Sequence, residues 1–192
     1  MLRDTLLRIA KELQGAQAQE FSGHPLAQFV RGQAAADVRL ALGHLERGLT
    51  CKGSAGAGNW ADVPWLAVFD PLVTSTATRG YYVVYLFNTR GLEVHLSLNQ
   101  GTTAVRTEFG AQARTVLKDR AALIRARLAD LLPTFKIYDL ALGSTGTLPR
   151  DYEAGHAFGF PYQLDVLPDE QILRADLQAL WEPTFLSHTA AV

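Results

Sequence analysis

The stretch between residues 80 and 99 constrains the fold of this chain more than any other. From Leu92 to Asn99 apolar and polar residues alternate strictly, which is the period of a β-strand with one face in the core and the other in water. The segment before it, Gly80 to Phe87, is dense in tyrosine and valine, and Asn88 to Gly91 has the composition of a turn. The sequence therefore predicts an antiparallel hairpin with one solvent-exposed face. The polar residues expected on that face are Glu93, His95, Ser97 and Asn99.

Four other segments are predicted to be helices, either because apolar residues recur every three or four positions or because the residues at their ends favour a helix. The first begins at the N-terminus and is marked by the spacing of Leu2, Leu6, Ile9 and Leu13. The last opens with Asp169 and Glu170, whose negative charges favour the start of a helix. The predicted helices run from the N-terminus to about Gln19, from Pro25 to Glu46, from Thr107 to Leu131 and from Pro168 to Leu180.

Further strands are predicted on both sides of the hairpin. Val63 to Phe69 is a nearly continuous apolar run, typical of a strand covered on both faces, and Pro64 indicates an edge position or a strand end. Short strands are expected around Phe135 to Leu140 and His156 to Leu164. The segment from Lys52 to Asn59 is so rich in glycine that we predict a loop there. The expected fold is α+β, a mainly antiparallel sheet flanked by N-terminal, central and C-terminal helices.

Composition places the chain among globular proteins. Its 192 residues, 48% hydrophobic and 19% charged, are expected to form one domain spanning residues 1–192. The longest apolar runs are far shorter than the ~20 residues of a membrane span, and the N-terminal segment lacks the pattern of a signal peptide. We therefore expect a cytoplasmic protein without a membrane partner. The net charge of −1 argues against binding of nucleic acid by the whole surface, but not against a few basic residues on one face.

Motifs for catalysis and metal binding are missing from the sequence. It has no G-x-x-x-x-G-K-[ST] phosphate loop and no G-x-S-x-G nucleophile elbow, its five histidines stand singly, and Cys51 is its one cysteine. A metal-dependent nuclease would need two acids and a lysine, but His95 stands two residues after Glu93, where the lysine would be, and Asp70 is the other candidate acid. We predict no catalytic site, no metal and no cofactor, and keep a nucleic-acid-processing enzyme as an alternative.

Aromatic residues gather around the glycine-rich segment, and they allow two interpretations. Aromatic side chains on strands usually belong to the core. Beside a loop rich in backbone donors they also suit a pocket that stacks a nucleic-acid base and reads its edge. By the two-residue period, Tyr82, Val84 and Leu86 share one strand face. The aromatic residues concerned are Trp60, Trp65, Tyr81, Tyr82 and Tyr85.

Taken together, these motifs resemble the N-terminal domain of the McrB family, the recognition subunit of methylcytosine-specific restriction systems. The resemblance covers nearly the whole chain. The motifs that carry it are Lys52-x-Ser54-x-Gly56-x-Gly58-Asn59-Trp60, Val63-Pro64-Trp65, Gly80-Tyr81-Tyr82 and Leu96-Ser97-Leu98-Asn99-Gln100-Gly101. Supporting segments are Gly23-His24-Pro25-Leu26, Leu142-Gly143-Ser144-Thr145 and Tyr152-Glu153-Ala154-Gly155.

The resemblance implies a reader of modified DNA, the specificity domain of a type IV-like restriction system active in phage defence. Such a domain binds double-stranded DNA and flips a modified cytosine, such as 5-methylcytosine, into an aromatic pocket. A nuclease or GTPase module would belong to the same protein or to a partner. Transferred to this sequence, the base pocket falls on Trp65, Tyr82 and Leu86. The loop against the DNA would include Lys52, Ser54, Gly56, Gly58, Asn59 and Trp60.

One position departs from the methylcytosine reader. That reader has a tyrosine in the loop where this chain has Ala57, which leaves Trp60 as the candidate to fill the vacated base stack. Additional polar contacts are expected from Asn99, Gln100, Arg79 and Arg90. Arg114, Lys118 and Arg125 form a stripe on the predicted central helix, which we interpret as a solvated face in preference to a phosphate site. The main alternative function is a protein-interaction module of a defence complex.

Overall fold

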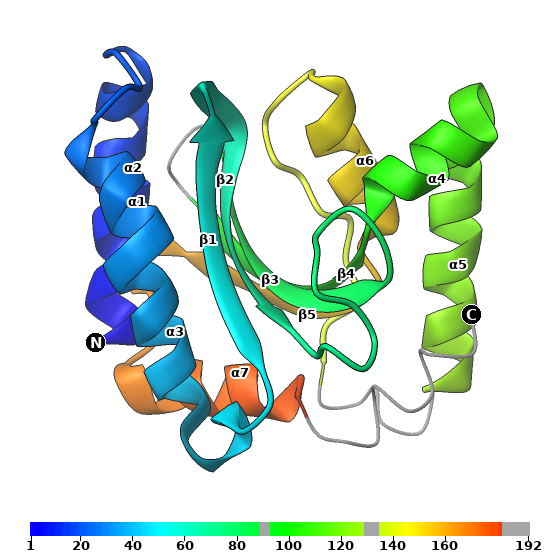
Figure 1. Ribbon diagram of the computed structural model, residues 1–192. Coiled ribbons are helices and arrows are strands. Elements are labelled where there is room, and N and C mark those ends of the chain that lie inside the picture. The colour runs from blue at the N-terminus through cyan, green and yellow to red at the C-terminus, as the bar shows by residue number, and fades with distance from the viewer. Residues whose placement is uncertain (89–92, 129–134, 182–192) are drawn as a thin grey trace.

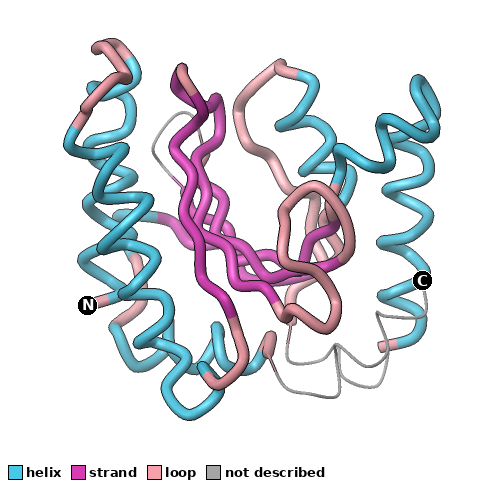
Figure 2. The backbone as a smooth tube through the Cα atoms, in the orientation of Figure 1, coloured by secondary structure: helices cyan, strands magenta, loops and turns pink. Residues whose placement is uncertain are grey.

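The computed structural model describes residues 1–88, 93–128 and 135–181, and within them one antiparallel sheet forms the centre of the fold. Its strands follow one another in sequence order and the sheet is strongly curved (Figure 2). The strands are β1 (Thr50–Ala57), β2 (Asn59–Phe69), β3 (Tyr81–Phe87), β4 (Glu93–Gln100) and β5 (Phe158–Gln163). The predicted hairpin is confirmed as the pair β3–β4, although most of its turn, Thr89 to Gly91, lies outside the described residues.

Helices flank the sheet on both sides, which confirms the expected α+β fold (Figure 1). On one side lie α1 (Leu2–Gln17), α2 (Pro25–Phe29), a π turn (Val30–Ala34), α3 (Ala35–Leu42), a 3-10 turn (Gly43–Glu46) and α7 (Glu170–Ala179). On the other side lie α4 (Thr102–Phe109), α5 (Ala113–Arg127) and α6 (Thr147–Gly155). No helix in the described ranges has the length and hydropathy needed to cross a membrane.

The predicted helices are present, but the bounds predicted for the central helix are wrong. The N-terminal and C-terminal helices are confirmed, and the helix expected between Pro25 and Glu46 exists in consecutive helical pieces. The central helix was expected to begin at Thr107, whereas α4 begins at Thr102 and the chain bends at Gly110, where φ is +52°. A positive φ breaks a right-handed helix, so α5 is a separate element. The expected end at Leu131 lies outside the described residues.

Both faces of the sheet are buried, and the side chains of β3 divide between them as the two-residue period predicts. Tyr81, Val83, Tyr85 and Phe87 pack with leucines of α1 and α7 in the main core. Tyr82, Val84 and Leu86 pack in a second cluster with residues from the 140–152 region.

The expectation of a solvent-exposed face on β4 is wrong. His95, Ser97 and Asn99 are each at most 3% exposed, because α6 and the segment from Tyr138 to Leu142 cover this face. The buried groups bond to one another: Ser97 Oγ lies 2.7 Å from His156 Nδ1, and Asn99 Nδ2 donates to the carbonyl oxygen of Tyr152 at 3.0 Å. Alternation therefore predicted the polarity of each face correctly, but Ser97 and Asn99 find their hydrogen-bond partners inside the protein rather than in water.

The prediction of a loop for the glycine-rich segment, Lys52 to Asn59, is also wrong. This segment forms most of strand β1 and its turn into β2. The register shifts between Ser54 and Gly56, and Gly58 occupies the tip with φ +78°. Pro64 is likewise not on an edge strand, since β2 lies between β1 and β3. It is accommodated where pairing lapses: β2 pairs with β3 only from Trp65 onward, and the bulge in β1 lies opposite.

Between Phe135 and Leu140 the expected strand is reduced to a single bridge from Lys136 to Gly159. The strand expected within residues 156–164 is confirmed as β5. Helix α6, between them, was not predicted. Its short length and its Thr-Leu-Pro start give a weak helical signal, so tertiary packing has to stabilise it.

The first prediction concerns Gly53, where β1 passes beneath the π turn. A Cβ atom at this position would lie 1.9 Å from the carbonyl oxygen of Val30 and 2.9 Å from Cδ2 of Leu66. We expect Gly53→Ala to lower the free energy of unfolding by about 1–3 kcal/mol, the usual cost of overpacking. In the control, Gly15→Ala on helix α1, a Cβ meets nothing within 4 Å, and we expect a gain of about 0.5–1 kcal/mol. Urea denaturation measures both, and equal stability of Gly53→Ala and the wild type would contradict this close approach.

The second prediction concerns His156, which is 3% exposed. Burial, followed by the charges of His95 and Arg125, lowers the pKa of His156 from 6.5 to about 3. Because the folded state disfavours the protonated ring, the stability that the neutral ring provides is complete above pH 6.5 and is lost as the pH falls from 6.5 toward 3. Between pH 7.5 and pH 5 the loss is about 2 kcal/mol.

The free energy of unfolding of the wild type and of His156→Gln, measured at pH 7.5 and pH 5, tests this prediction. The variant should be less stable at pH 7.5 but should lose about 2 kcal/mol less than the wild type on acidification. His44→Gln, at an exposed position, is the control and should keep the wild-type pH dependence. An equal loss in the wild type and in His156→Gln would show that His156 does not contribute to this pH dependence.

Candidate functional site

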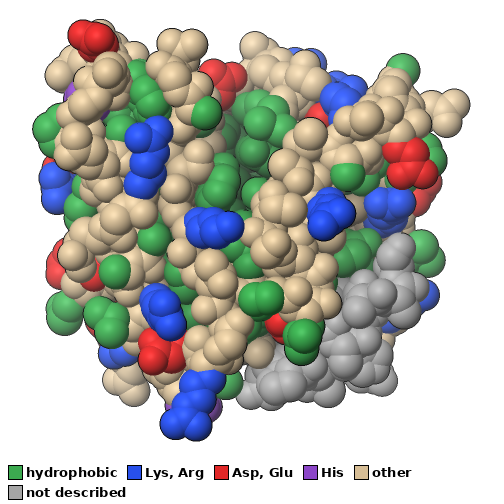
Figure 3. Space-filling view, in the orientation of Figure 1, with side chains coloured by type: hydrophobic (Ala, Val, Ile, Leu, Met, Phe, Trp, Pro, Cys, Tyr) green, Lys and Arg blue, Asp and Glu red, His purple; other side chains and the backbone are tan. Residues whose placement is uncertain are grey.

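A cavity of about 450 Å³ lies between the tip of the β1–β2 hairpin and the first turn of α6; we call it the hairpin cavity. Figure 3 shows a hollow with hydrophobic side chains along it in the upper part of the molecule, between the regions of these two elements. The hairpin contributes most of residues 54–65 to its wall, and α6 contributes its first turn and Tyr152. The wall includes Ser54, Gly56, Asn59, Trp60, Val63, Trp65, Gly146, Thr147, Leu148, Pro149 and Tyr152.

Trp65 forms the principal aromatic wall of the hairpin cavity. It is half-buried, lies opposite Ser54 in the β1–β2 register, and packs edge-on to Phe69 with the ring centroids 6.5 Å apart. Tyr152 approaches from α6 and is 8% exposed. Burial raises the pKa of Tyr152 to about 12, while its contact with the Trp65 side chain acts in the opposite direction. Both rings are therefore uncharged at neutral pH and present apolar surface.

The other two residues of the predicted base pocket lie behind Trp65. Tyr82 and Leu86 are each 2% exposed and belong to the same hydrophobic cluster as Trp65, but neither contributes to the cavity wall. The Tyr82 hydroxyl donates to the carbonyl oxygen of Ala77 at 3.2 Å, and burial raises the pKa of Tyr82 well above 10. The structure thus brings the predicted residues together, with Trp65 at the surface of the cluster and the other two beneath it.

The tip of the hairpin carries small, exposed residues: Ala57, Gly58 and Asn59. Trp60, the candidate to fill a vacated base stack, also contributes to the cavity wall, but its indole packs against the main core. Its Nε1 donates to the carbonyl oxygen of Gln19 at 3.0 Å, and the rings of Phe21 and His24 pack edge-on to it. Trp60 packs against the main core and Trp65 against the second cluster, so the two rings lie on different sides of the sheet. Trp60 therefore anchors the hairpin to the α1–α2 connection.

The predicted basic contacts are dispersed. Lys52 lies on the same face as Trp65 but toward the far end of β1, where its Nζ donates to the carbonyl oxygen of Ser75 at 3.0 Å. Arg79 is exposed just before β3, and Arg90 lies outside the described residues.

The two amides predicted to make polar contacts are inside the protein. Asn99 and Gln100 are 1% and 2% exposed. Besides its bond to Tyr152, the Asn99 side chain accepts from the Gln100 backbone N–H at 2.8 Å. Gln100 Nε2 donates to the carbonyl oxygens of Leu117 at 2.9 Å and Gly155 at 3.3 Å. Both amides hold β4 to the helices, so neither reaches the surface in this structure.

Several residues at the hairpin cavity were missed by sequence reasoning. Arg31 Nη2 donates to the carbonyl oxygen of Gly56 at 2.9 Å, which places a cation beside the hairpin tip. Asp62 Oδ2 accepts from Ser144 Oγ at 2.9 Å and so ties the hairpin to the segment before α6. The motif segments 142–145 and 152–155 were the available signal for the α6 side, but they carried no assigned role.

The residues considered for catalysis remain apart. Asp70 follows β2 at the sheet end near Tyr81, whereas Glu93 lies at the opposite end of β4. In the described part of the chain no three His, Cys, Asp or Glu side chains are grouped so that they could hold a metal ion. Burial raises the pKa of Cys51 to about 12, which keeps it a thiol rather than a reactive thiolate.

Comparison with known proteins agrees with the motif resemblance. A search of curated proteins finds no match to this chain. The family model described as the MrcB-like N-terminal domain matches residues 8–183, which include every element of the sheet and the hairpin cavity. The chain therefore belongs to the MrcB-like N-terminal domain family.

Proposed function

We propose that this chain is the specificity domain of a modification-dependent restriction system and that it holds a flipped, modified cytosine of double-stranded DNA in the hairpin cavity. The observation that carries the proposal is the half-buried indole of Trp65 on the wall of an accessible cavity of about 450 Å³. Ligand cavities usually fall between about 300 and 1,000 Å³. Membership in the MrcB-like family supports a place in such a system.

The cavity offers both kinds of contact that a flipped base requires. Trp65 and Tyr152 supply flat apolar surface for stacking. Ser54, Asn59 and Thr147 supply polar side chains for the edge of the base, and the first turn of α6 adds backbone N–H groups, since its N-cap Gly146 has no side chain to cap them. Flipping costs a few kcal/mol, and stacking returns about 1–3 kcal/mol before any edge contact forms.

Discrimination by a single methyl group requires a close-fitting wall. Full burial of a methyl contributes only about 0.8 kcal/mol, a factor of about four in affinity. Val63 and Pro149 are both buried and line the cavity from opposite sides, where they supply apolar surface for such a group.

The surroundings of the cavity fit an approach of the duplex over the hairpin tip. The tip has no bulky side chain, so its backbone can come close to DNA, and Arg31 lies beside it. Lys52 is exposed further along the same face of the sheet. In this proposal the chain recognises the base, and cleavage or GTP hydrolysis belongs to another module in the same protein or in a partner.

The third prediction tests this role of Trp65. Fluorescence anisotropy would compare matched duplexes with cytosine, 5-methylcytosine, 5-hydroxymethylcytosine or N6-methyladenine at one site. We expect a preference for one modified-cytosine duplex, and a loss of about 5- to 100-fold in that preferred affinity in Trp65→Ala, the range that one stacking contact provides. A 2-aminopurine next to the site should brighten when the wild type binds, because flipping unstacks it.

Ile172→Ala, which truncates another large apolar side chain at an exposed position on α7, is the matched control and should bind like the wild type. Circular dichroism and urea denaturation would establish that both variants fold. Weak and equal binding of all four duplexes by the wild type would refute the proposal and favour a protein-interaction module. Unchanged binding by folded Trp65→Ala would move the base site away from this cavity.

A further inference from the structure

A second cavity, of about 470 Å³, lies on the other side of α6, between that helix, α5 and residues 138–140. Pro149 and Tyr152 of α6 line the hairpin cavity, whereas Arg150, Glu153 and Ala154 line this one. From α5 it receives the basic stripe noted in the sequence. We call it the basic cavity, after its four cationic side chains: Arg114, Lys118, Arg125 and Arg150.

The positive charge on this wall is only partly neutralised. Two carboxylates, Asp139 and Glu153, also line the cavity, and Glu153 Oε1 already accepts from the backbone N–H of Leu142 at 2.8 Å. Lys118 and Arg150 are exposed, and neither forms an ion pair with any residue in the described ranges. Four cations against two carboxylates leave an excess of positive charge that favours an anionic ligand.

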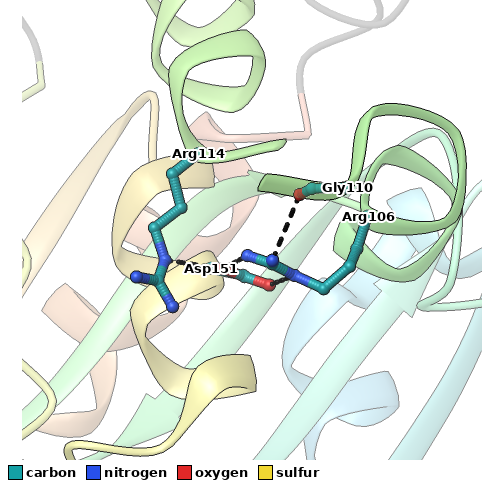
Figure 4. Close-up of polar contacts among 4 residues, drawn as sticks. All are labelled: Arg106, Gly110, Arg114 and Asp151. Atoms are coloured by element: carbon teal, nitrogen blue, oxygen red, sulfur yellow. Dashed lines mark hydrogen bonds and ion pairs between the residues drawn. The ribbon is translucent and has the colours of Figure 1, made fainter. Parts of the chain in front are cut away.

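The arginines of α5 are held in place by the protein itself. Asp151, 1% exposed, bonds to Arg106 and accepts from Arg114 Nε at 2.9 Å. Figure 4 shows that this contact uses the Nε edge of Arg114 and leaves its two terminal nitrogens pointing away from Asp151. Arg125 is fixed by donation from Nη1 to the carbonyl oxygen of Ala157 at 2.9 Å. A guanidinium group that is already held along one edge loses little further conformational entropy when its remaining N–H groups bind an oxyanion.

His156 adds a ring nitrogen without a partner. Ser97 Oγ lies 2.7 Å from His156 Nδ1 and also accepts from Asn99 Nδ2 at 3.3 Å. The other ring nitrogen of His156, Nε2, is buried and has no hydrogen-bond partner among the described residues. The ring of Tyr138, also on the cavity wall and partly exposed, lies 4.6 Å from the His156 ring. The wall therefore combines cations, an unpartnered imidazole nitrogen and an aromatic face.

We propose that the basic cavity binds a phosphate ester, with Lys118, Arg150 and the terminal nitrogens of Arg114 around the phosphate oxygens. This inference goes beyond the proposed base site and does not depend on it. A phosphate has several oxygens for a lysine and two guanidinium groups, and a cavity of this size has room for an attached sugar or base against Tyr138. The ester can come from the DNA backbone or from a free nucleotide.

The fourth prediction uses the double variant Lys118→Gln/Arg150→Gln, which removes the two exposed cations of the basic cavity. Its control, Lys11→Gln/Arg47→Gln, makes the same change of charge at two exposed positions in α1 and just before β1. Anisotropy with a short unmodified duplex at several salt concentrations tests the DNA backbone as the source. Calorimetric titration with ATP tests a free nucleotide.

If the phosphate belongs to DNA, the cavity variant should bind the duplex about tenfold or more weakly at low salt, and the slope of log K against log[salt] should become shallower by about 1 for each lost phosphate contact. If it belongs to a nucleotide, heat of ATP binding should be seen with the wild type and the control and be lost in the cavity variant. Either result supports the proposal.

Equal binding by the cavity and control variants in both assays, or no binding of either ligand by the wild type, would overturn it. The ratio of affinities for modified and unmodified duplexes separates this proposal from the base site. The cavity variant should keep that ratio, whereas Trp65→Ala should lose it.

Discussion

The attachment of α6 to the polar face of β4 is the interaction on which the second half of the structure depends. Asn99 donates to the carbonyl oxygen of Tyr152, and Gln100 donates to that of Gly155, so two buried amides fix the helix to the strand. Each bond lies in a low-dielectric interior, where leaving either partner unsatisfied costs about 1–3 kcal/mol. This cost selects one position for a helix of weak intrinsic propensity. Because α6 forms one wall of both cavities, the same two amides determine their shape.

The periodicity of the sequence was sufficient to predict the elements, but not what covers them. The alternation in β4, the apolar spacing in α1 and the acidic first turn of α7 are local signals, and the structure has these elements where the signals indicated. Whether the polar face of β4 meets water depends on His156, 59 residues beyond Ser97. Strand β1 was missed for a related reason: its glycines lower strand propensity, yet Gly53 is needed where β1 passes close to Val30.

The candidate site, like the fold, could be predicted only in part. The motifs led to Trp65 and to the hairpin tip, because those residues lie in one short segment whose composition is unusual. The two-residue period correctly placed Tyr82 and Leu86 on one face of β3. It could not indicate that Trp65 packs over them, because that contact depends on the tertiary structure. Gly-Asn-Trp likewise identified Trp60 without indicating that its indole bonds to Gln19. Sequence patterns thus indicate on which face of an element a side chain lies, whereas its exposure to solvent depends on the elements that pack against that face.

The two faces of α6 explain how one short helix contributes to cavities of such different chemistry. Pro149 and Tyr152, three positions apart, share an apolar side toward the hairpin, whereas Arg150 and Glu153, shifted by one position, share a charged side toward α5. Asp151 lies between these pairs, is buried, and binds arginines on both α4 and α5. The carboxylate thereby holds α6 against the helical layer while the amides of β4 hold it to the sheet. A helix fixed on both sides can keep an apolar and a basic cavity apart across the width of its own backbone.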